Sequence, residues 1–218
     1  LRARFERSRS ARPKDGRTLA SLAAEEAAVE GALLPHRAAA VGVQGADATF
    51  VGAKFPRFPR IIRLGIESLT LPNGTQLDLE IVRHPGGAAV VAINAQQQVC
   101  LLRQYRHAAG GWLWELPAGK LEPGEAAQLT AQRELEEEAG LQAADWRRLG
   151  ETLTTPGFCD EVIHLFLARQ LSRVPARPQA HELIEVHWLP LATAVAQVQG
   201  GEIRDAKTML GLLLAANC

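Results

Sequence analysis

The segment Gly119–Leu141, GKLEPGEAAQLTAQRELEEEAGL, is the stretch from which the fold of this chain is deduced. Pro123-Gly124 predicts a turn ahead of a short helix. Gly140 follows the helix and is the residue type that most often ends a helix in the left-handed conformation. The segment therefore predicts a loop, one helix and a second loop.

Acidic side chains crowd this helix. Glu134 lies three residues before Glu137 and four before Glu138, so the three carboxylates share a face and repel one another. A solvated acidic surface is the commoner meaning of such a run. Clustered carboxylates with room for water also suit a hard divalent cation such as magnesium.

The apolar residues of the helix predict which of its faces packs against a sheet. At about 100° per residue, Leu129, Leu135 and Ala139 fall on the side opposite the three glutamates. The separation is incomplete, because three polar residues share the apolar side: Gln128, Gln132 and Glu136.

Every defined position of the segment resembles the Nudix box. The matching positions are Gly119, Glu125, Arg133-Glu134-Leu135, Glu137-Glu138 and Gly140-Leu141. The chain is therefore similar to the Nudix hydrolase family. The resemblance implies an α+β fold, the Nudix α/β/α sandwich with a mixed central sheet and an additional N-terminal antiparallel sheet. It also implies an enzyme that holds a divalent metal against a pyrophosphate.

The resemblance also implies a set of metal ligands. Mg²⁺, with Mn²⁺ as an alternative, is expected between Glu134, Glu138 and the backbone carbonyl of Ala118, with Glu137 close by. We interpret Arg133 as an internal partner that orients a glutamate, so it would support catalysis without binding substrate.

The general base is expected on a loop after the box, as it often is in this family. Glu182 is our first choice, since it lies just before a predicted strand. Glu161 and the box residue Glu137 compete with it, and an ordinary solvated acid is the alternative reading of Glu182.

Four flanking segments resemble the ADP-ribose pyrophosphatase branch of the family. They are Arg103–Arg106 (RQYR), Glu115–Gly119 (ELPAG), Thr155–Phe158 (TPGF) and Gly201–Thr208 (GEIRDAKT). This implies hydrolysis of ADP-ribose to AMP and ribose 5-phosphate. A pyrophosphatase of GDP-mannose or another nucleotide sugar is the alternative, and a domain that senses ADP-ribose without cleaving it is an alternative of another class.

The same resemblance implies the residues that bind the nucleoside diphosphate sugar. These are Arg106, Glu115, Pro156 and Gly157. Arg106 is expected at a phosphate or ribose, because a planar guanidinium with five donors suits such groups, although an exposed cation at a strand end is the alternative. Phe55 and Phe58 are weak candidates for stacking on the adenine.

Composition excludes some classes of function. The 218 residues include 24 basic and 24 acidic side chains, and this balance argues against a general role at nucleic acid or a membrane surface. The apolar runs are too short to span a bilayer. Three cysteines, Cys100, Cys159 and Cys218, lack the spacing of metal ligands and predict a reducing, cytoplasmic location.

The chain is expected to have two parts. Residues 1–58 are Arg-, Ser- and Ala-rich and predict a poorly ordered or accessory extension, with one helix over Thr18–Gly31. A transit peptide is the alternative, weakened by the acidic residues there. Residues 59–218 are expected to form the Nudix domain. Its first part, 59–86, resembles the N-terminal sheet that forms a homodimer in this branch.

Hydrophobic patterns predict the remaining elements. Strands are expected at Arg60–Leu69 and Gln76–Arg83 as one hairpin, at Ala88–Ile93 and Gln98–Gln104 as a second pair, and at Trp112–Leu116, Trp146–Thr154, Val162–Arg169 and Glu185–Pro190. Helices are expected at Leu191–Val198 and Lys207–Ala216.

Overall fold

The computed structural model describes residues 49–54, 61–179 and 182–218. The chain divides after residue 47, and the described residues all belong to its second unit, Ala48–Cys218. The helix expected over Thr18–Gly31 and the candidate stacking residues Phe55 and Phe58 lie outside the described residues. The expected division at residue 58 stays a prediction.

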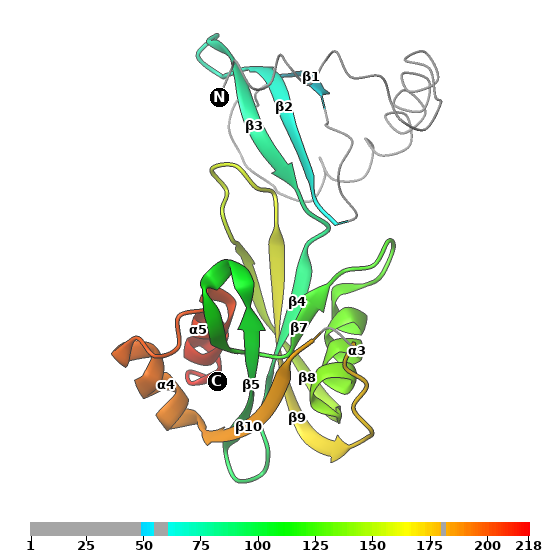
Figure 1. Ribbon diagram of the computed structural model, residues 1–218, viewed down its shortest axis with the longest axis vertical. Coiled ribbons are helices and arrows are strands. Elements are labelled where there is room, and N and C mark those ends of the chain that lie inside the picture. Colours follow the sequence, from blue (N-terminus) through cyan, green and yellow to red (C-terminus); the bar gives the residue numbers. More distant parts are fainter. Residues whose placement is uncertain (1–48, 55–60, 180–181) are drawn as a thin grey trace. The chain divides into compact units, whose positions relative to one another are not determined.

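The elements of the second unit follow one another as strands with a helix after β7 and two helices at the end (Figure 1). They are β1 Thr49–Lys54, β2 Arg63–Thr70, β3 Gln76–Arg83, β4 Gly87–Ala92, β5 Gln98–Arg106, η2 His107–Ala109, β6 Gly111–Glu115, β7 Ala118–Lys120, α3 Ala127–Ala139, β8 Leu141–Leu153, β9 Val162–Arg173, β10 Ile184–Pro190, α4 Leu191–Gly200 and α5 Ala206–Ala215.

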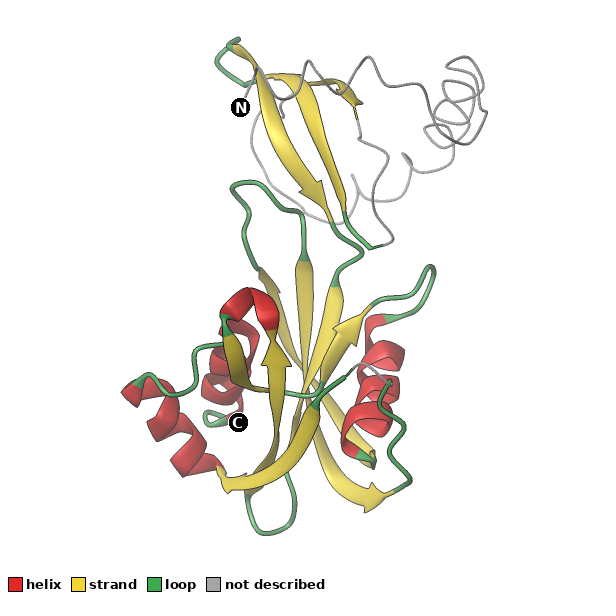
Figure 2. Cartoon of the chain, in the orientation of Figure 1, coloured by secondary structure: helices red, strands yellow, loops and turns green. Residues whose placement is uncertain are grey.

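These strands form three sheets. The four-stranded sheet has the order β7-β4-β9-β8, and it is mixed because β4 and β9 run parallel while the other neighbours are antiparallel. A second sheet has the order β10-β5-β6, and the third has the order β1-β2-β3. Figure 2 shows α3 on one side of the first two sheets and α4 with α5 on the other. This is the predicted α+β arrangement.

Strand β4 lies at the centre of the fold and is buried along its whole length. Its sequence, GAAVVA, is a continuous run of small apolar residues, which is typical of a strand covered on both faces. Ala89 and Val91 join the core formed with α4 and α5. Ala88 and Val90, on the opposite face, join the core formed with α3. One strand therefore supports the helices of both layers.

The predicted pairing of the strands at 88–93 and 98–104 is wrong. Apart from one isolated bridge between Ile93 and Val99, β4 and β5 belong to different sheets. The turn between them, which Asn94 stabilises by accepting from the backbone N–H groups of Gln96 and Gln98, carries the chain from one sheet to the next. A strand buried on both faces takes partners from distant segments, here β7 and β9, which a local pattern does not reveal.

The hairpin predicted around Pro72-Asn73-Gly74 is confirmed as β2 and β3. Buried Glu67 of β2 accepts two hydrogen bonds from Arg83 at the end of β3, at 2.8 and 2.5 Å. Arg83 also donates to Asp160, and the N–H of Val82 donates to the carbonyl of Phe158 at 2.7 Å. The end of β3 is thus held by the segment that follows the turn at Pro156.

The other predicted strands and helices are confirmed with shifts at their ends. Strand β8 starts at Leu141, five residues before its predicted start, because its first part lacks the alternation of apolar and polar residues. β1 and β7 were not expected from the sequence, and β7 is only three residues long. No helix in the described part of the chain is both long and apolar enough to cross a bilayer.

Candidate active site

Helix α3 carries Glu134, Glu137 and Glu138, and its small and apolar residues pack it against the sheet. Ala131 and Leu135 are fully buried against the sheet, and Gly140 ends the helix with φ 64°, donating its N–H to the carbonyl of Glu136. The prediction that Leu129 packs on the sheet is wrong, since that side chain is 56% exposed. It lies two residues before Ala131, about 200° around the helix, and so points to the opposite side.

The predicted placement of Glu138 opposite the packed face is also wrong. Glu138 is only 4% exposed, because it follows Leu135 by three residues and shares its inward side. Its Oε2 accepts a hydrogen bond from the backbone N–H of Ala118 at 2.8 Å. The pKa of Glu138 is raised to about 8, mainly by burial; the hydrogen bond from Ala118 opposes this shift, and the charges of Glu134 and Glu182 add to it.

Glu134 lies directly against the backbone of β7. A Cβ atom on Gly119 would come within 1.8 Å of Glu134 Oε1, so any other residue type would require this carboxylate to move. Burial raises the pKa of Glu134, as do the charges of Glu137 and Glu182, while Arg133 lowers it. The close contact with Glu134 therefore explains why the first box position, residue 119, is a glycine.

Arg133 connects several carboxylates of the segment. Its Nε and Nη2 donate to Glu125 at 3.1 and 3.0 Å, and its Nη1 donates to Glu134 at 2.7 Å. The same Nη1 lies 3.5 Å from Glu137, and Nη2 also donates to the carbonyl of Lys120. The structure thus places Arg133 as an internal partner of these glutamates.

The predicted metal ligands are all hard oxygen donors, which fit Mg²⁺ or Mn²⁺. Among the described residues, no group of three or more His, Cys, Asp or Glu side chains is arranged to hold a metal ion. Burial is the main cause of the raised pKa values of Glu134 and Glu138, and the charges of neighbouring carboxylates add to it. The donor set and its excess of negative charge fit a divalent cation, and the ligands Glu134, Glu138 and Ala118 stay predictions.

Two of the three candidates for the general base, Glu182 and Glu161, differ in their surroundings. Glu182 acts electrostatically on both Glu134 and Glu138, so the loop before β10 brings it close to the box. Its Oε2 accepts from the N–H of Gln179 at 2.8 Å. Glu161 is held elsewhere: its Oε2 accepts from Thr154 at 2.8 Å and its Oε1 lies 3.2 Å from His84 Nδ1.

Arg106 and Glu115, both predicted to bind substrate, contact each other. Arg106 donates to both oxygens of Glu115, from Nε at 2.8 Å and from Nη2 at 3.0 Å. Lys207 donates to Glu115 Oε2 at 2.7 Å and to Asp205 at 3.0 Å. Burial opposes the charge of Glu115, but the bond from Arg106 and the charge of Lys207 bring its pKa below the usual value.

Lys207 lies in the GEIRDAKT segment, and the sequence alone did not predict a role for it. Burial would lower its pKa, but the charges of Asp205 and Glu115 raise it, so the ammonium stays charged. The signal in the sequence was a lysine and an aspartate two residues apart at the start of a helix. Glu115, which accepts a hydrogen bond from Lys207, is 92 residues away from it, and only the fold reveals this contact.

Pro156 and Gly157 form an exposed turn between β8 and β9. The turn is closed by hydrogen bonds from the N–H groups of Phe158 and Cys159 to the carbonyl of Thr155, at 3.1 and 2.9 Å. Their predicted role in binding substrate stays a prediction.

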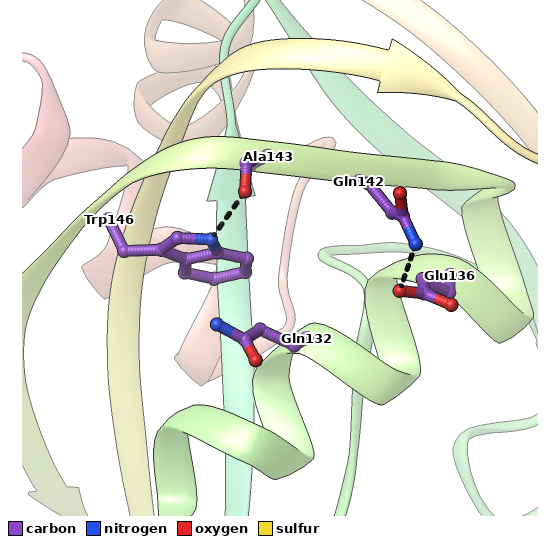
Figure 3. A pocket seen from close by; sticks show the side chains of 5 residues that line it. All are labelled: Gln132, Glu136, Gln142, Ala143 and Trp146. Atoms are coloured by element: carbon purple, nitrogen blue, oxygen red, sulfur yellow. Dashed lines mark hydrogen bonds between the residues drawn. The ribbon is translucent and has the colours of Figure 1, made fainter.

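The polar residues Gln132 and Glu136, on the predicted apolar side of α3, face strand β8. Figure 3 shows Gln132 and Glu136 reaching from α3 toward β8, where they line a shallow pocket with Gln142, Ala143 and Trp146. Gln142 donates to Glu136 at 2.7 Å, and the indole N–H of Trp146 donates to the carbonyl of Ala143 at 2.9 Å. This face is a polar seam between helix and strand, separate from Glu134 and Glu138.

Cys100 is buried near the box and is a structural thiol. Burial raises its pKa to about 12, and the charge of Glu138 acts in the same direction. All three cysteines, Cys100, Cys159 and Cys218, are free.

The chain resembles known proteins in sequence and in fold. The chain is 40% identical over 151 residues to an ADP-ribose pyrophosphatase of Bacillus subtilis strain 168, covering 68% of this chain and 82% of the relative. It is 39% identical over 155 residues to a methanol dehydrogenase activator of Bacillus methanolicus, covering 70% and 84%. Among solved structures, the crystal structure of an ADP compounds hydrolase matches with a TM-score of 0.69 at 20% identity, covering 80% of this chain and 96% of that one.

The structural match shows the same fold, and the relatives bear out the predicted class, a pyrophosphohydrolase. The sequence model of the NUDIX domain matches residues 83–210, which include the box, Arg106, Glu182 and Lys207. The chain therefore belongs to the NUDIX domain family.

Proposed function

We propose that this protein hydrolyses the pyrophosphate bond of ADP-ribose, giving AMP and ribose 5-phosphate. The observation that carries the proposal is the group of neighbouring carboxylates on α3, where Glu134 and Glu138 have raised pKa values and Glu182 adds further negative charge. Carboxylates with strongly shifted pKa values cluster at functional sites. We take the substrate from the name of the Bacillus subtilis relative, an ADP-ribose pyrophosphatase.

A divalent metal fits the carboxylate side of this site. Glu134, Glu138 and the carbonyl of Ala118 would hold it, with Glu137 nearby. When bound, such a cation neutralises the pyrophosphate, polarises a phosphorus and acidifies water. It would also offset the repulsion among the carboxylates. Mg²⁺ is proposed first and Mn²⁺ second.

The protein's own groups would then position and activate the reactants. Glu182 is proposed to accept a proton from the attacking water. The water oxygen forms a bond to one phosphorus, and the bond from that phosphorus to the bridging oxygen breaks. The bridging oxygen leaves on the other phosphate, so one water yields AMP and ribose 5-phosphate. Positioning and charge stabilisation supply most of the rate in phosphoryl transfer.

Arg106 is proposed to bind a phosphate of the substrate. Its side chain is 42% exposed although Glu115 holds one edge of the guanidinium. The charge of Glu138 contributes to the raised pKa of Arg106, so the guanidinium lies near the acidic side of the site. A cation next to the metal-binding carboxylates suits a pyrophosphate that must contact both.

The choice of Glu182 as base is testable against Glu161. Glu182→Gln should lower kcat about 10²- to 10⁴-fold with little change in KM, because a base acts on the transition state and not on substrate affinity. Glu161→Gln, which removes an acid held by Thr154 and His84, is the matched control and should retain kcat within about threefold. Steady-state kinetics of both variants would reject Glu182 if its kcat stayed near normal.

The substrate is tested by separating the products of a small panel on anion exchange. The pure protein is incubated with Mg²⁺ and ADP-ribose, GDP-mannose, ADP-glucose, NADH or a diadenosine polyphosphate. AMP released fastest from ADP-ribose supports the proposal. Faster release of GMP from GDP-mannose would move the specificity to the other nucleotide sugars. Binding of ADP-ribose without any cleavage would support the sensor, against which the complete box argues.

Two finer proposals concern the setting of the enzyme. We propose a homodimer formed through the β2–β3 hairpin, on the resemblance to this branch, and sedimentation velocity tests it directly. We also propose a cytoplasmic location, because the free cysteines suit a reducing compartment. Cell fractionation tests the second proposal.

A further inference from the structure

We propose that Lys207 is a positioning residue of the substrate site, which acts through Glu115 to hold the guanidinium of Arg106 ready for a substrate phosphate. The inference rests on the proposed function, in which Arg106 binds a phosphate of the substrate. It assigns a specific task to the start of α5, far in sequence from the box.

The contacts of Glu115 carry the first step. This carboxylate is 2% exposed and is bonded from two sides, by Arg106 at both oxygens and by Lys207 at Oε2. A bidentate pair fixes the plane of a guanidinium as well as its position. Arg106 uses Nε and Nη2 for this, and its Nη1 makes no hydrogen bond to any residue that the structure describes. One edge of the guanidinium is therefore held, and the other edge is available to an anion.

The charges carry the second step. Arg106 and Lys207 are positive, Glu115 and Asp205 are negative, and the four are linked by contacts of 2.7 to 3.0 Å, so the cluster is neutral. Without Lys207, two carboxylates would face one guanidinium. That guanidinium already feels the charge of Glu138. Lys207 thus limits the negative potential at the place where an anionic substrate must bind.

The start of α5 explains why the ammonium sits at this point. Asp205 caps the helix by accepting from the N–H of Thr208 at 3.0 Å. The hydroxyl of Thr208 in turn accepts from the N–H of Leu116, the residue after Glu115, at 2.9 Å. These bonds fix the first turn of α5 to the end of β6. Lys207, only 17% exposed, is thereby held within reach of Glu115.

The test compares three variants. Lys207→Met removes the charge and keeps the bulk, and Lys207→Arg restores the charge. Leu212→Val, in the buried face of the same helix and away from the ionic cluster, is the control for lost stability. Side-chain ¹⁵N NMR of arginine, with Arg106 assigned by its own substitution, reports whether the Nε–H is held by Glu115. We expect its hydrogen exchange to speed up at least about tenfold in Lys207→Met and to stay within about twofold of the parent in Leu212→Val.

Kinetics provide the second measurement. With a compound that the protein hydrolyses as substrate, Lys207→Met should raise KM about tenfold and change kcat less, because Arg106 binds ground and transition states alike. Lys207→Arg should recover part of that loss. In a protein that already carries Arg106→Met, Lys207→Met should change kcat/KM by less than about twofold, since its effect passes through Arg106.

The outcomes separate the two proposals. An unchanged Arg106 signal in Lys207→Met, or a full multiplicative loss in the Arg106→Met background, would overturn the positioning role. Equal losses in Lys207→Met and Leu212→Val would do the same, by assigning Lys207 to stability alone. If the Arg106 signal changes as expected but the unsubstituted protein cleaves no compound, the positioning stands and the proposed function fails.

Discussion

Two groups of ionisable side chains in this protein each contain a buried glutamate and yet have opposite electrostatics. The acidic group consists of Glu134, Glu138 and Glu182, and the balanced group of Arg106, Glu115, Lys207 and Asp205. Glu138 is 4% exposed and Glu115 is 2% exposed. Burial raises the pKa of the first to about 8, whereas the pKa of the second lies below its usual value because two cations contact it.

The difference teaches that burial alone does not decide the state of a carboxylate. A buried carboxylate with cationic partners is part of the framework, and one without them costs stability. Proteins keep such a cost where an activity requires it. We therefore propose that the chemistry takes place at the acidic group and that the balanced group orients the residues around it.

The largest expected effect comes from removing the charge of Glu138. Glu138→Gln should lower kcat/KM about 10³-fold or more, which corresponds to about 4 kcal/mol. Without divalent metal, the same variant should unfold with a free energy equal to or about 1 kcal/mol above that of the parent, because a carboxylate that burial disfavours is gone. Kinetics and urea unfolding measure both quantities. Glu136→Gln, on the polar seam of the same helix, is the control and should keep its activity within about twofold.

The balanced group should respond in the opposite direction. Glu115→Gln leaves Arg106 and Lys207 without their shared carboxylate in a buried place, so the free energy of unfolding should fall by about 3 kcal/mol. Urea unfolding at neutral pH, side by side with Glu138→Gln, checks the sign. Equal shifts in the two variants would mean that the two groups do not differ as proposed.

The sequence predicted the acidic group better than the balanced one. Glu134, Glu137 and Glu138 were proposed from the motif, which spaces them on one short helix, and Glu182 from the family resemblance, which implies a base on a loop after the box. Arg106 and Glu115 were also predicted, but as separate ligands of substrate. Their mutual contact depends on the pairing of β5 with β6. Lys207 reaches Glu115 because the first turn of α5 is hydrogen-bonded to Leu116.

The errors in the fold have the same origin. The hairpin at Pro72–Gly74 and the end of α3 at Gly140 were predictable, because turn and cap residues act locally. The partners of β4 were not, because a strand buried on both faces has no polar side to indicate its neighbours. Leu129 was assigned to the core by a stripe of three residues, while Ala131 and the buried Glu138 define the packed face.

A smaller effect is expected from Gly119, the residue that makes room for the acidic group. Gly119→Ala would place a Cβ 1.8 Å from Glu134 Oε1, and the carboxylate would have to move. We expect kcat/KM to fall about 10- to 100-fold, a size typical of residues that orient ligands. Gly74→Ala is the matched control, since it meets no atom within 4 Å but has φ +83°. It should cost about 1 kcal/mol of stability and no activity. The reverse pattern in the two variants would contradict the steric explanation.

Glu125 sharpens the comparison most, because it belongs to the box and yet resembles the balanced group. The bond from Arg133 is the main reason that its pKa falls to about 2 from an ordinary value of 4.5. A lowered folded-state pKa stabilises the protein above the unfolded value and loses that effect as pH falls toward the folded one. Glu125→Gln should therefore be destabilised by about 1 kcal/mol at pH 6, a figure reduced by solvent at this partly exposed site. The difference from the parent should shrink steadily below pH 4.5 and approach zero near pH 2. Urea unfolding at several pH values measures it, and a difference that does not change with pH would show that Arg133 holds Glu125 by shape and not by charge.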